Sequence, residues 1–408
     1  MKILVSEYFS GGALSRSSLT THLLVEGYAM AYFLAIDFFA SKIDVTLTLD
    51  YRLSPSHTEL GLKIAKITPN EGYMKKIVEL ASHFDYTVII APSQSNTLAK
   101  ILTILEDRGI SLINSKSATV SKVANKYYVY KVLKIKNINV PLSEVAQSND
   151  IDCIRKIAKD LGFPVVIKPI CSDGSEDVFL IRTRNHLSTV LGHIKNLPNR
   201  EILIQEFVSG IPASLSLLVN ESGKTVVMSI NKQNILIDPT SGKMTYIGGH
   251  TPLCYVNDEI KKLANLIVES FSGLKGYVGI DVIINRDGIY VIEINPRLTT
   301  SYVGLRRVLN ENVGLQLVRF ATDSNFNPAI NYKNEICAFR VLRSTRKLQL
   351  TKKLLNIVDQ ETLSIPPVVG LTVQKGDPVG LVMVSESSLH RAYTKIYRIK
   401  RDLQRLGG

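Results

Sequence analysis

The stretch from residue 277 to residue 302 constrains the fold most, because it predicts a tight hairpin of two buried strands. Residues 278–284 and 289–294 are rich in β-branched side chains, and an Asp-Gly pair at 287–288 separates them. Asp-Gly between two such runs is a strong signal for a short turn that joins antiparallel strands. The chain is therefore expected to place these two strands side by side.

Three oxygen-bearing side chains stand on this predicted hairpin. Asp281 lies inside the first strand, whereas Glu293 and Asn295 end the second strand and project to one face. Isoleucines flank Glu293, which argues against a solvated hairpin, because buried carboxylates need a positive partner. Such oxygen ligands suit Mg²⁺ bound to nucleotide phosphates, with Mn²⁺ as an alternative. Arg297 follows on the exit loop, where a fixed guanidinium can hold a phosphoryl group in transfer.

This arrangement resembles the ATP-grasp superfamily, in which an Asp on one strand and a Glu-x-Asn on the next hold the magnesium ions of ATP. The resemblance extends from about residue 115 to residue 320, and more loosely over the whole chain. It implies an α/β (α+β) protein with a two-lobed grasp core at residues 116–330. An open α/β domain at residues 1–115 precedes this core, and a small β-rich module at residues 331–408 follows it.

The first 115 residues independently predict a small open α/β domain. Three apolar strands alternate with helical stretches, an order typical of a parallel sheet. The Gly-Gly pair of this region is no dinucleotide fingerprint, because GxGxxG is absent. The resemblance implies that Glu7, Tyr8, Gly11 and Gly12 line the substrate cleft, and an ordinary loop at a strand end is the alternative.

Two lysines are expected to contact the phosphates of ATP. Lys168 lies in the apolar run 165–169, where a buried cation needs an anionic partner; a snorkelling lysine on an edge strand is the alternative. Lys126 lies in a helix predicted over residues 117–137, where the superfamily places a phosphate-binding lysine. The loop at 172–178 occupies the position of the family's flexible phosphate lid.

The segment after the strand at 201–207 corresponds to the family's adenine-binding hinge. By resemblance, Gln205, Glu206, Phe207 and Val208 meet the base, with Glu206 as the side-chain partner. The family commonly places another Glu a few residues later, for the ribose or the metal. Ser214 is the expected substitute for that Glu in this chain.

Composition and charge argue against nucleic-acid-binding, zinc-binding, disulfide-bonded and membrane-spanning proteins. The net charge is +13, but the basic residues are dispersed and no nucleic-acid module is visible. The densest basic run, at 390–405, is interpreted as a solvated closing segment. Four dispersed cysteines argue against a zinc site or disulfides and favour a reducing cytoplasm. The apolar stretch at 23–40 contains Glu26 and Asp37 and is too short and too charged to span a membrane.

Together these motifs indicate an ATP-dependent carboxylate–amine ligase that forms an amide through an acylphosphate. Such catalysis depends on positioning and charge, and no Ser-His-Asp or Cys-His arrangement is visible. The run at 295–305 and the N-terminal Glu-Tyr and Gly-Gly pairs resemble the tyramine–glutamate ligases of methanofuran biosynthesis. L-glutamate and tyramine are therefore the expected substrates. Another amino-acid or peptide ligase, or a nucleotide-binding regulatory protein without turnover, stays open, as does a homodimer.

Overall fold

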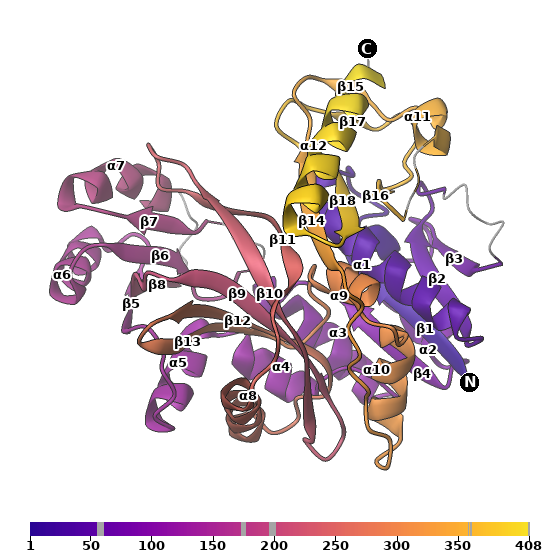
Figure 1. Cartoon of the computed structure of the whole chain (residues 1–408), viewed down its shortest axis with the longest axis horizontal. Coiled ribbons are helices and arrows are strands. Elements are labelled where there is room, and N and C mark those ends of the chain that lie inside the picture. Colours follow the sequence, from indigo (N-terminus) through magenta and orange to yellow (C-terminus); the bar gives the residue numbers. More distant parts are fainter. Residues whose placement is uncertain (55–60, 173–176, 196–200, 358, 360, 407–408) are drawn as a thin grey trace.

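Three principal sheets organise the computed structural model (Figure 1), which describes residues 1–54, 61–172, 177–195, 201–357, 359 and 361–406. A parallel sheet holds the N-terminal region, a four-stranded antiparallel sheet follows, and an eight-stranded antiparallel sheet completes the molecule. The two antiparallel sheets lie on either side of the cleft described below.

The N-terminal sheet is parallel throughout, as the alternating strand and helix pattern predicts. Its strands, in spatial order, are β3 (Lys63–Ile67), β2 (Asp44–Asp50), β1 (Lys2–Glu7) and β4 (Tyr86–Ile90). Its connections contain η1 (Phe9–Ala13), α1 (Thr21–Ala40), α2 (Tyr73–Ala81), η3 (Gln94–Asn96) and α3 (Thr97–Glu106).

Helix α1 is apolar nearly all round because it is buried on most of its surface. It packs against the parallel sheet and against elements that come much later in the chain, including α9 (Tyr302–Val308) and β18 (Pro378–Glu386). Among the described residues this is the one helix long and apolar enough to cross a membrane, and 72% of its most apolar window is buried inside the protein. Its burial and its two acidic residues identify α1 as a core helix.

The lysine-rich helix predicted over 117–137 is in fact two helices, α4 (Ser117–Val123) and α5 (Lys126–Ile135). Asn125 lies just past the end of α4 and caps α5, because its side chain accepts a hydrogen bond from the backbone N–H of Tyr128. The break places Lys126 at the first position of α5, from which its amine enters the cleft.

The four-stranded antiparallel sheet is covered by α6 (Ile151–Leu161) and α7 (Arg184–Lys195), whose apolar side chains form one core with the sheet. Its strands, in spatial order, are β5 (Ser143–Gln147), β8 (Glu201–Glu206), β6 (Val165–Pro169) and β7 (Phe179–Ile181). The lysine-bearing strand β6 is therefore an interior strand of this sheet.

The eight-stranded sheet contains the predicted hairpin, formed by its first two strands and closed where Asn285 pairs with Gly288. In spatial order its strands are β13 (Gly288–Asn295), β12 (Gly276–Asn285), β9 (Ile211–Val219), β10 (Thr225–Ile237), β11 (Met244–Cys254), β14 (Ile336–Arg343), β18 and β16 (Leu363–Ser364). Helix α8 (Asp258–Ser270) packs beneath β10, and α10 (Val313–Thr322) packs against β9 and β12. The hairpin prediction is confirmed.

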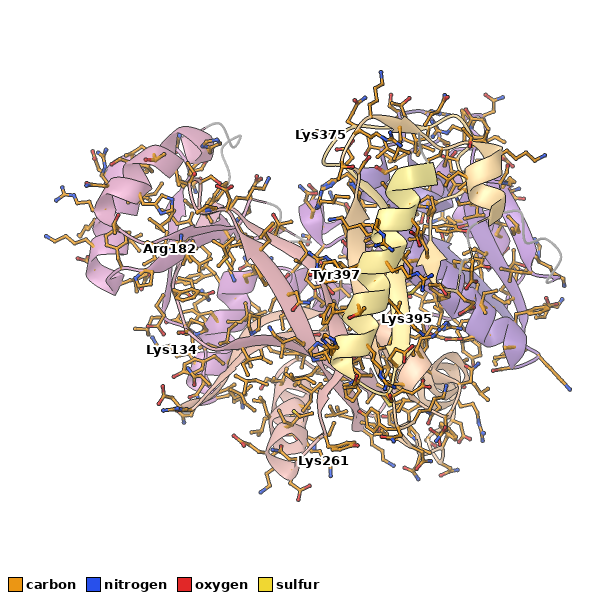
Figure 2. The ribbon with its side chains drawn as sticks, turned by 45° about the horizontal axis from the view of Figure 1, so that its top comes forward. Lys134, Arg182, Lys261, Lys375, Lys395 and Tyr397 are labelled. Carbon is orange, nitrogen blue, oxygen red and sulfur yellow. The ribbon has the colours of Figure 1, made fainter. Side chains whose placement is uncertain are left out.

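The C-terminal segment adds three strands to this large sheet, because β14 pairs with β11 and β18 pairs with β14 and β16. Its remaining elements are β15 (Leu348–Gln349), β17 (Thr372–Val373), α11 (Lys352–Ile357) and α12 (Leu389–Leu406). The basic run at 390–405 is thus a helix, with Ala392 and Ile396 buried against the sheet and Lys395 facing outward (Figure 2). The domain boundaries at 115 and 330 stay predictions.

Candidate functional site

The two antiparallel sheets line an open cleft, and the space between them, counted with its solvent-filled mouth, is about 1350 Å³. Its lining includes every residue that the sequence assigned to ATP, metal or phosphoryl binding: Lys126, Lys168, Gln205, Glu206, Phe207, Val208, Ser214, Asp281, Glu293, Asn295 and Arg297. These residues come from five strands, one helix and two loops. The structure brings them together, and their individual roles stay predictions.

The carboxylates of the hairpin face each other in the strand ladder. Asp281 pairs directly with Glu293, and the amide of Asn295 donates to Asp281 Oδ2 at 3.2 Å. Burial and, to a smaller extent, the nearby Glu293 charge raise the pKa of Asp281 to about 7. Two carboxylates held this close on a buried face suit a divalent cation.

The donor set on the hairpin consists of two carboxylates and one amide. Within the described part of the chain, no three His, Cys, Asp or Glu residues stand close enough to hold a metal ion. A bound Mg²⁺ would therefore take its remaining ligands from water and from nucleotide phosphates, as this ion commonly does. The residues present fit that mode of binding.

Gln233 is a site residue that the sequence prediction missed. It lies on β10 and donates from Nε2 to Asp281 Oδ1 at 2.8 Å, so it orients one of the two hairpin carboxylates. Ser214, on the neighbouring strand β9, lies opposite Asp281 in the ladder and also lines the cleft. Both residues are positioned by β9, which pairs with β10 on one side and with β12 on the other.

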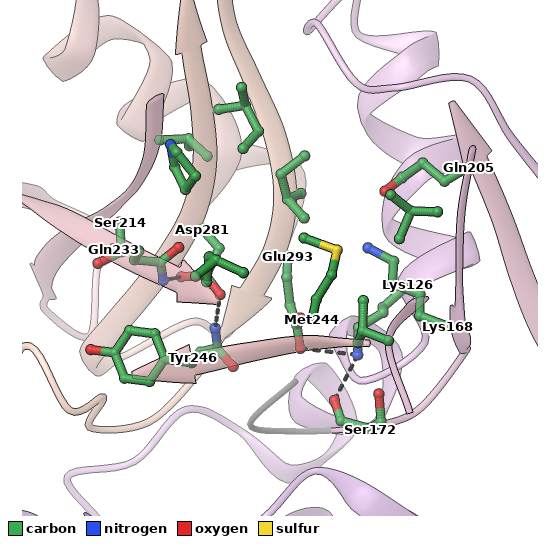
Figure 3. A pocket seen from close by; sticks show the side chains of 18 of the residues that line it. Lys126, Lys168, Ser172, Gln205, Ser214, Gln233, Met244, Tyr246, Asp281 and Glu293 are labelled. Carbon is green, nitrogen blue, oxygen red and sulfur yellow. Dashed lines mark hydrogen bonds and ion pairs between the residues drawn. The ribbon is translucent and has the colours of Figure 1, made fainter. Parts of the chain in front are cut away.

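The two predicted phosphate lysines enter the cleft from different elements. Lys126 lies 3.0 Å from Glu293 Oε1 and donates to the Ser172 carbonyl at 2.7 Å (Figure 3). Lys168 is only 4% exposed, and among the described residues its amine makes no hydrogen bond or ion pair. Burial and, to a smaller extent, the like charge of Lys126 lower the pKa of Lys168 to about 8. An interior, buried lysine cannot snorkel to water, so the edge-strand alternative is excluded.

In the hinge after β8, two backbone N–H groups are hydrogen-bonded to other parts of the chain. The N–H of Glu206 donates to the Leu142 carbonyl, and that of Phe207 donates to the Pro164 carbonyl. In the described chain the N–H of Val208 has no such partner. Val208 is therefore the hinge donor that a base edge can reach.

An apolar slot surrounds this hinge. The side chains that form it are Pro141, Val166, Val178, Pro212, Ile235, Met244, Val282, Ile283 and Ile292. A flat heteroaromatic ring fits between such side chains, while its edge meets backbone groups. The side chain of Gln205 is held in place by its bond to Ser143 Oγ at 2.9 Å.

The predicted lid at 172–178 is described only in part. Residues 173–176 lie outside the described residues, whereas Ser172 and Val178 line the cleft. Asp177 adopts a left-handed backbone conformation, with φ 55°. The position of the loop beside the cleft agrees with the prediction as far as these residues go.

The polar end of the cleft lies away from the hinge, at the exit loop of the hairpin. Arg297, Thr299, Thr300 and Ser301 line it, together with Glu26 from α1. Thr300 Oγ1 donates to Glu26 Oε2 at 2.5 Å, which joins the exit loop to the N-terminal domain. The sequence prediction did not include Glu26, because it was considered only as a charge within an apolar helix.

A buried hydroxyl network supports this exit loop from behind. The Tyr277 hydroxyl donates to Ser216 Oγ at 2.7 Å and lies 3.3 Å from Thr299 Oγ1. Ser301 Oγ lies 2.8 Å from Thr299 Oγ1. The network fixes the hydroxyls that face the cleft.

The prediction that the N-terminal loop lines the cleft is wrong. Glu7 is 3% exposed and accepts hydrogen bonds from the backbone N–H of Phe9 and of Ser10. Tyr8 packs edge-on against Tyr73 within the N-terminal domain. Among the described residues, Glu7 and Tyr8 do not contribute to the cleft lining. Glu7 instead holds the loop in shape, which explains an acidic residue at this strand end.

The two glycines of the same loop also serve packing. A side chain at Gly11 would approach Thr48 Oγ1 within 2.9 Å, and one at Gly12 would meet Ile67 within 2.6 Å. Gly12 also has φ 107°, a conformation that favours glycine. Both glycines therefore allow the loop to pass close to β2 and β3.

Sequence comparison agrees with this geometry. Residues 123–301 match the ATP-grasp domain, and residues 43–120 match the pre ATP-grasp 3 domain. The chain is 29% identical over 246 residues to the tyramine–L-glutamate ligase of Methanocaldococcus jannaschii, a match that covers 60% of this chain and 66% of that protein, just under two thirds. It is 30% identical over 277 residues to the ligase of the same name from Methanocaldococcus fervens, with coverages of 67% and 78%.

Solved structures share the fold. N5-carboxyaminoimidazole ribonucleotide synthetase from Thermotoga maritima aligns with TM-score 0.63 and 18% identity, covering 98% of each chain. N5-carboxyaminoimidazole synthase from Aspergillus clavatus, in complex with ADP and 5-aminoimidazole ribonucleotide, aligns with TM-score 0.70 and 16% identity over the same coverage. At these identities the likeness concerns the fold alone. With the sequence matches, it shows that this chain belongs to the ATP-grasp superfamily of ADP-forming carbon–nitrogen ligases, close to the tyramine–L-glutamate ligases.

Proposed function

We propose that the protein joins the carboxylate of L-glutamate to tyramine in an ATP-dependent reaction that passes through an acylphosphate. The observation that carries this proposal is a cleft in which paired carboxylates, the buried Lys168 and Arg297 converge. The apolar slot at one end suits adenine, and the polar end suits a charged substrate. The substrate pair is supported by the names of the two similar ligases.

The first step transfers the γ-phosphoryl group from ATP to a carboxylate. A carboxylate oxygen attacks the γ-phosphorus, the bond to the bridging oxygen breaks, and ADP and an acylphosphate form. Lys168 neutralises charge on the triphosphate, and Arg297 neutralises charge on the phosphoryl group as it moves. Asp281, Glu293 and Asn295 would hold Mg²⁺, which when bound supplies positive charge to the phosphate oxygens.

The second step forms the amide. The neutral amine attacks the acyl carbon, the carbon–oxygen bond to phosphate breaks, and inorganic phosphate and one proton are released. The chain's residues contribute by holding the two reactants in contact and by excluding water from the acylphosphate. No side chain needs to become covalently bound.

Arg297, Thr299 and Thr300 are the groups proposed to hold the anionic ends of the carboxylate substrate. Guanidinium and hydroxyl donors are well suited to carboxylate oxygens. Arg297 also donates from Nη1 to the Leu298 carbonyl at 3.0 Å, which restrains its orientation.

The remaining parts of the proposal concern the cellular compartment, the oligomeric state and the metal ion. The four cysteines are free, which supports a reducing cytoplasm. A homodimer and Mn²⁺ in place of Mg²⁺ belong to the proposal as well, and size measurement and metal titration test them.

The proposal is tested with purified protein, Mg-ATP, L-glutamate and tyramine. Phosphate release and a product with the mass of γ-glutamyltyramine are expected, and Glu293→Ala serves as the inactive control. Phosphate release with a different amino acid or amine, and none with this pair, would retain the ligase class and reject the substrates. ATP binding without turnover on a panel of amines and amino acids would favour the regulatory alternative.

A further inference from the structure

Glu26 is an acidic side chain among the arginine and hydroxyl groups of the exit loop that line the cleft. It lies on α1 in the N-terminal domain and reaches the polar end of the cleft. Among the described residues it accepts one hydrogen bond, from Thr300 to Oε2. A carboxylate can accept about four hydrogen bonds, so Glu26 has acceptor capacity left for a ligand in the cleft.

Arg297 and Tyr246 indicate where Glu26 lies relative to the hairpin carboxylates, because both are close to Glu26 and to Asp281. Arg297 lowers the pKa of Glu26 and also that of Asp281, so its guanidinium lies near both carboxylates. Tyr246 is likewise near both, because the charges of Glu26 and Asp281 each raise its pKa. Figure 3 shows Tyr246 on the side of the cleft that holds Asp281 and Gln233, opposite Lys126 and Lys168. Glu26 is thus near Arg297 and near Tyr246, which lies on the Asp281 side of the cleft.

A carboxylate in this position is unfavourable unless a cation meets it. Burial raises the pKa of Glu26, and Thr300, Arg297, Arg343 and His22 only partly oppose that rise. The triphosphate would not lower its energy, because it is anionic. Both substrates of the proposed reaction carry an ammonium group, but only tyramine joins that group to an apolar ring of the kind that Tyr246 can contact.

We propose that Glu26 recognises the ammonium group of the amine substrate and holds it beside the exit loop. This inference rests on the proposed ligase function and adds the acceptor subsite to it. The ring of Tyr246 lies in the same part of the cleft, so it can contact an aromatic or aliphatic body of the amine next to the ammonium group. The chemical class of the acceptor is therefore a protonated primary amine with an apolar portion.

The alternative role for Glu26 is purely structural, as the acceptor that ties Thr300 to α1. Glu26→Gln separates the two roles, because the amide oxygen of Gln can still accept from Thr300 Oγ1 whereas the negative charge is lost. If Glu26 recognises the amine, this variant should raise KM for tyramine by roughly 10- to 150-fold, the range for losing a charged hydrogen bond. KM for ATP and for L-glutamate should change by less than about threefold.

A neutral nucleophile provides the second arm of the test. Hydroxylamine is uncharged at neutral pH and converts an acylphosphate to a hydroxamate, so the Glu26→Gln variant should use it as well as the wild type does. Glu79→Gln, which removes a charge from the exposed face of α2, is the matched control and should leave every constant unchanged. An equal loss with hydroxylamine and tyramine, or a higher KM for glutamate alone, would overturn the assignment.

Direct binding separates this inference from the proposed function. Calorimetric titration of the wild type and of Glu26→Gln with tyramine, in the presence of ADP and Mg²⁺, requires no turnover. Tighter binding to the wild type supports the role of Glu26 even if glutamate is not the donor. Tyramine that binds both proteins equally, or neither, contradicts the inference, whereas hydroxamate formation by the wild type would still support the ligase reaction.

Discussion

Replacing Lys168 with Met should weaken ATP binding and, at the same time, stabilise the protein without ligand. The side chain lies in the interior strand β6, 4% exposed and without a counterion among the described residues. Its charge is unfavourable in the empty cleft and favourable when phosphate arrives. One substitution should therefore move stability and affinity in opposite directions.

The size of the stability change follows from the pKa of Lys168. Burial lowers that pKa from 10.5 to about 8, and each pKa unit corresponds to about 1.4 kcal/mol. Ionised Lys168 thus lowers the free energy of unfolding by about 3 kcal/mol at neutral pH. Because the folded-state pKa is the lower one, the penalty is complete below pH 8 and disappears as the pH rises to 10.5. Removal of a charged contact to phosphate should weaken ATP binding by roughly 10- to 150-fold.

Two measurements check this pair of effects. Urea denaturation at pH 7 and pH 10 should show the variant to be more stable at the lower pH and nearly equal to the wild type at the higher one. Calorimetry should show the loss of ATP affinity, while Lys261→Met, an exposed change on α8, should alter neither property. Unchanged ATP affinity, or a variant that is less stable at pH 7, would refute the proposal that Lys168 binds an ATP phosphate.

Three further predictions concern the metal site, the exit loop and the core. Glu293→Ala should abolish phosphate release and its dependence on Mg²⁺ while circular dichroism stays unchanged; near-normal turnover would reject the metal assignment. Tyr277→Phe removes the hydroxyl that supports Thr299, so KM for the carboxylate substrate should rise about fivefold, the effect of one hydrogen bond, with ATP affinity unchanged in calorimetry. Burial lowers the pKa of His250 to about 4 from 6.5, so the folded form resists protonation and stability falls as pH drops through this interval. Between pH 7 and pH 5 the free energy of unfolding of His250→Gln should therefore fall by about 2 kcal/mol less than that of the wild type, as measured by denaturation at both pH values.

The hairpin and its site residues could be predicted because their signals are local. Asp-Gly between two β-branched runs specifies a turn, and the alternation along a strand places Glu293 and Asn295 on one face. Lys168 was recognisable because a charge inside an apolar strand is rare. Each of these inferences needs only neighbours within a few residues, and the structure places all three residues in the cleft.

Residues that depend on long-range strand pairing were not predictable in the same way. Gln233 reaches Asp281 only because β9 lies between β10 and β12 and brings them into one sheet. The sequence prediction missed the break between α4 and α5, because Asn125 is compatible with a helix interior as well as with a helix cap. Only the structure shows that its side chain caps α5 by bonding to the N–H of Tyr128. Glu7 misled the prediction because a strand-end carboxylate can cap its own loop as readily as it can bind a ligand.

Glu26 did leave a periodic signal in the sequence. It precedes Asp37 by 11 residues, which is close to three turns of helix, so the two carboxylates share one face of α1 about 16 Å apart. One segment of the late chain meets both: Thr300 bonds Glu26, and Arg306 pairs with Asp37 at 2.8 Å. The buried ion pair between Asp37 and Arg306 fixes α1 against α9. This fixed position of α1 determines where Glu26 enters the cleft. Two acidic residues on one face of an otherwise apolar helix therefore indicate a partner with cationic and hydroxyl groups, and in this protein the partner is the segment that carries Arg297.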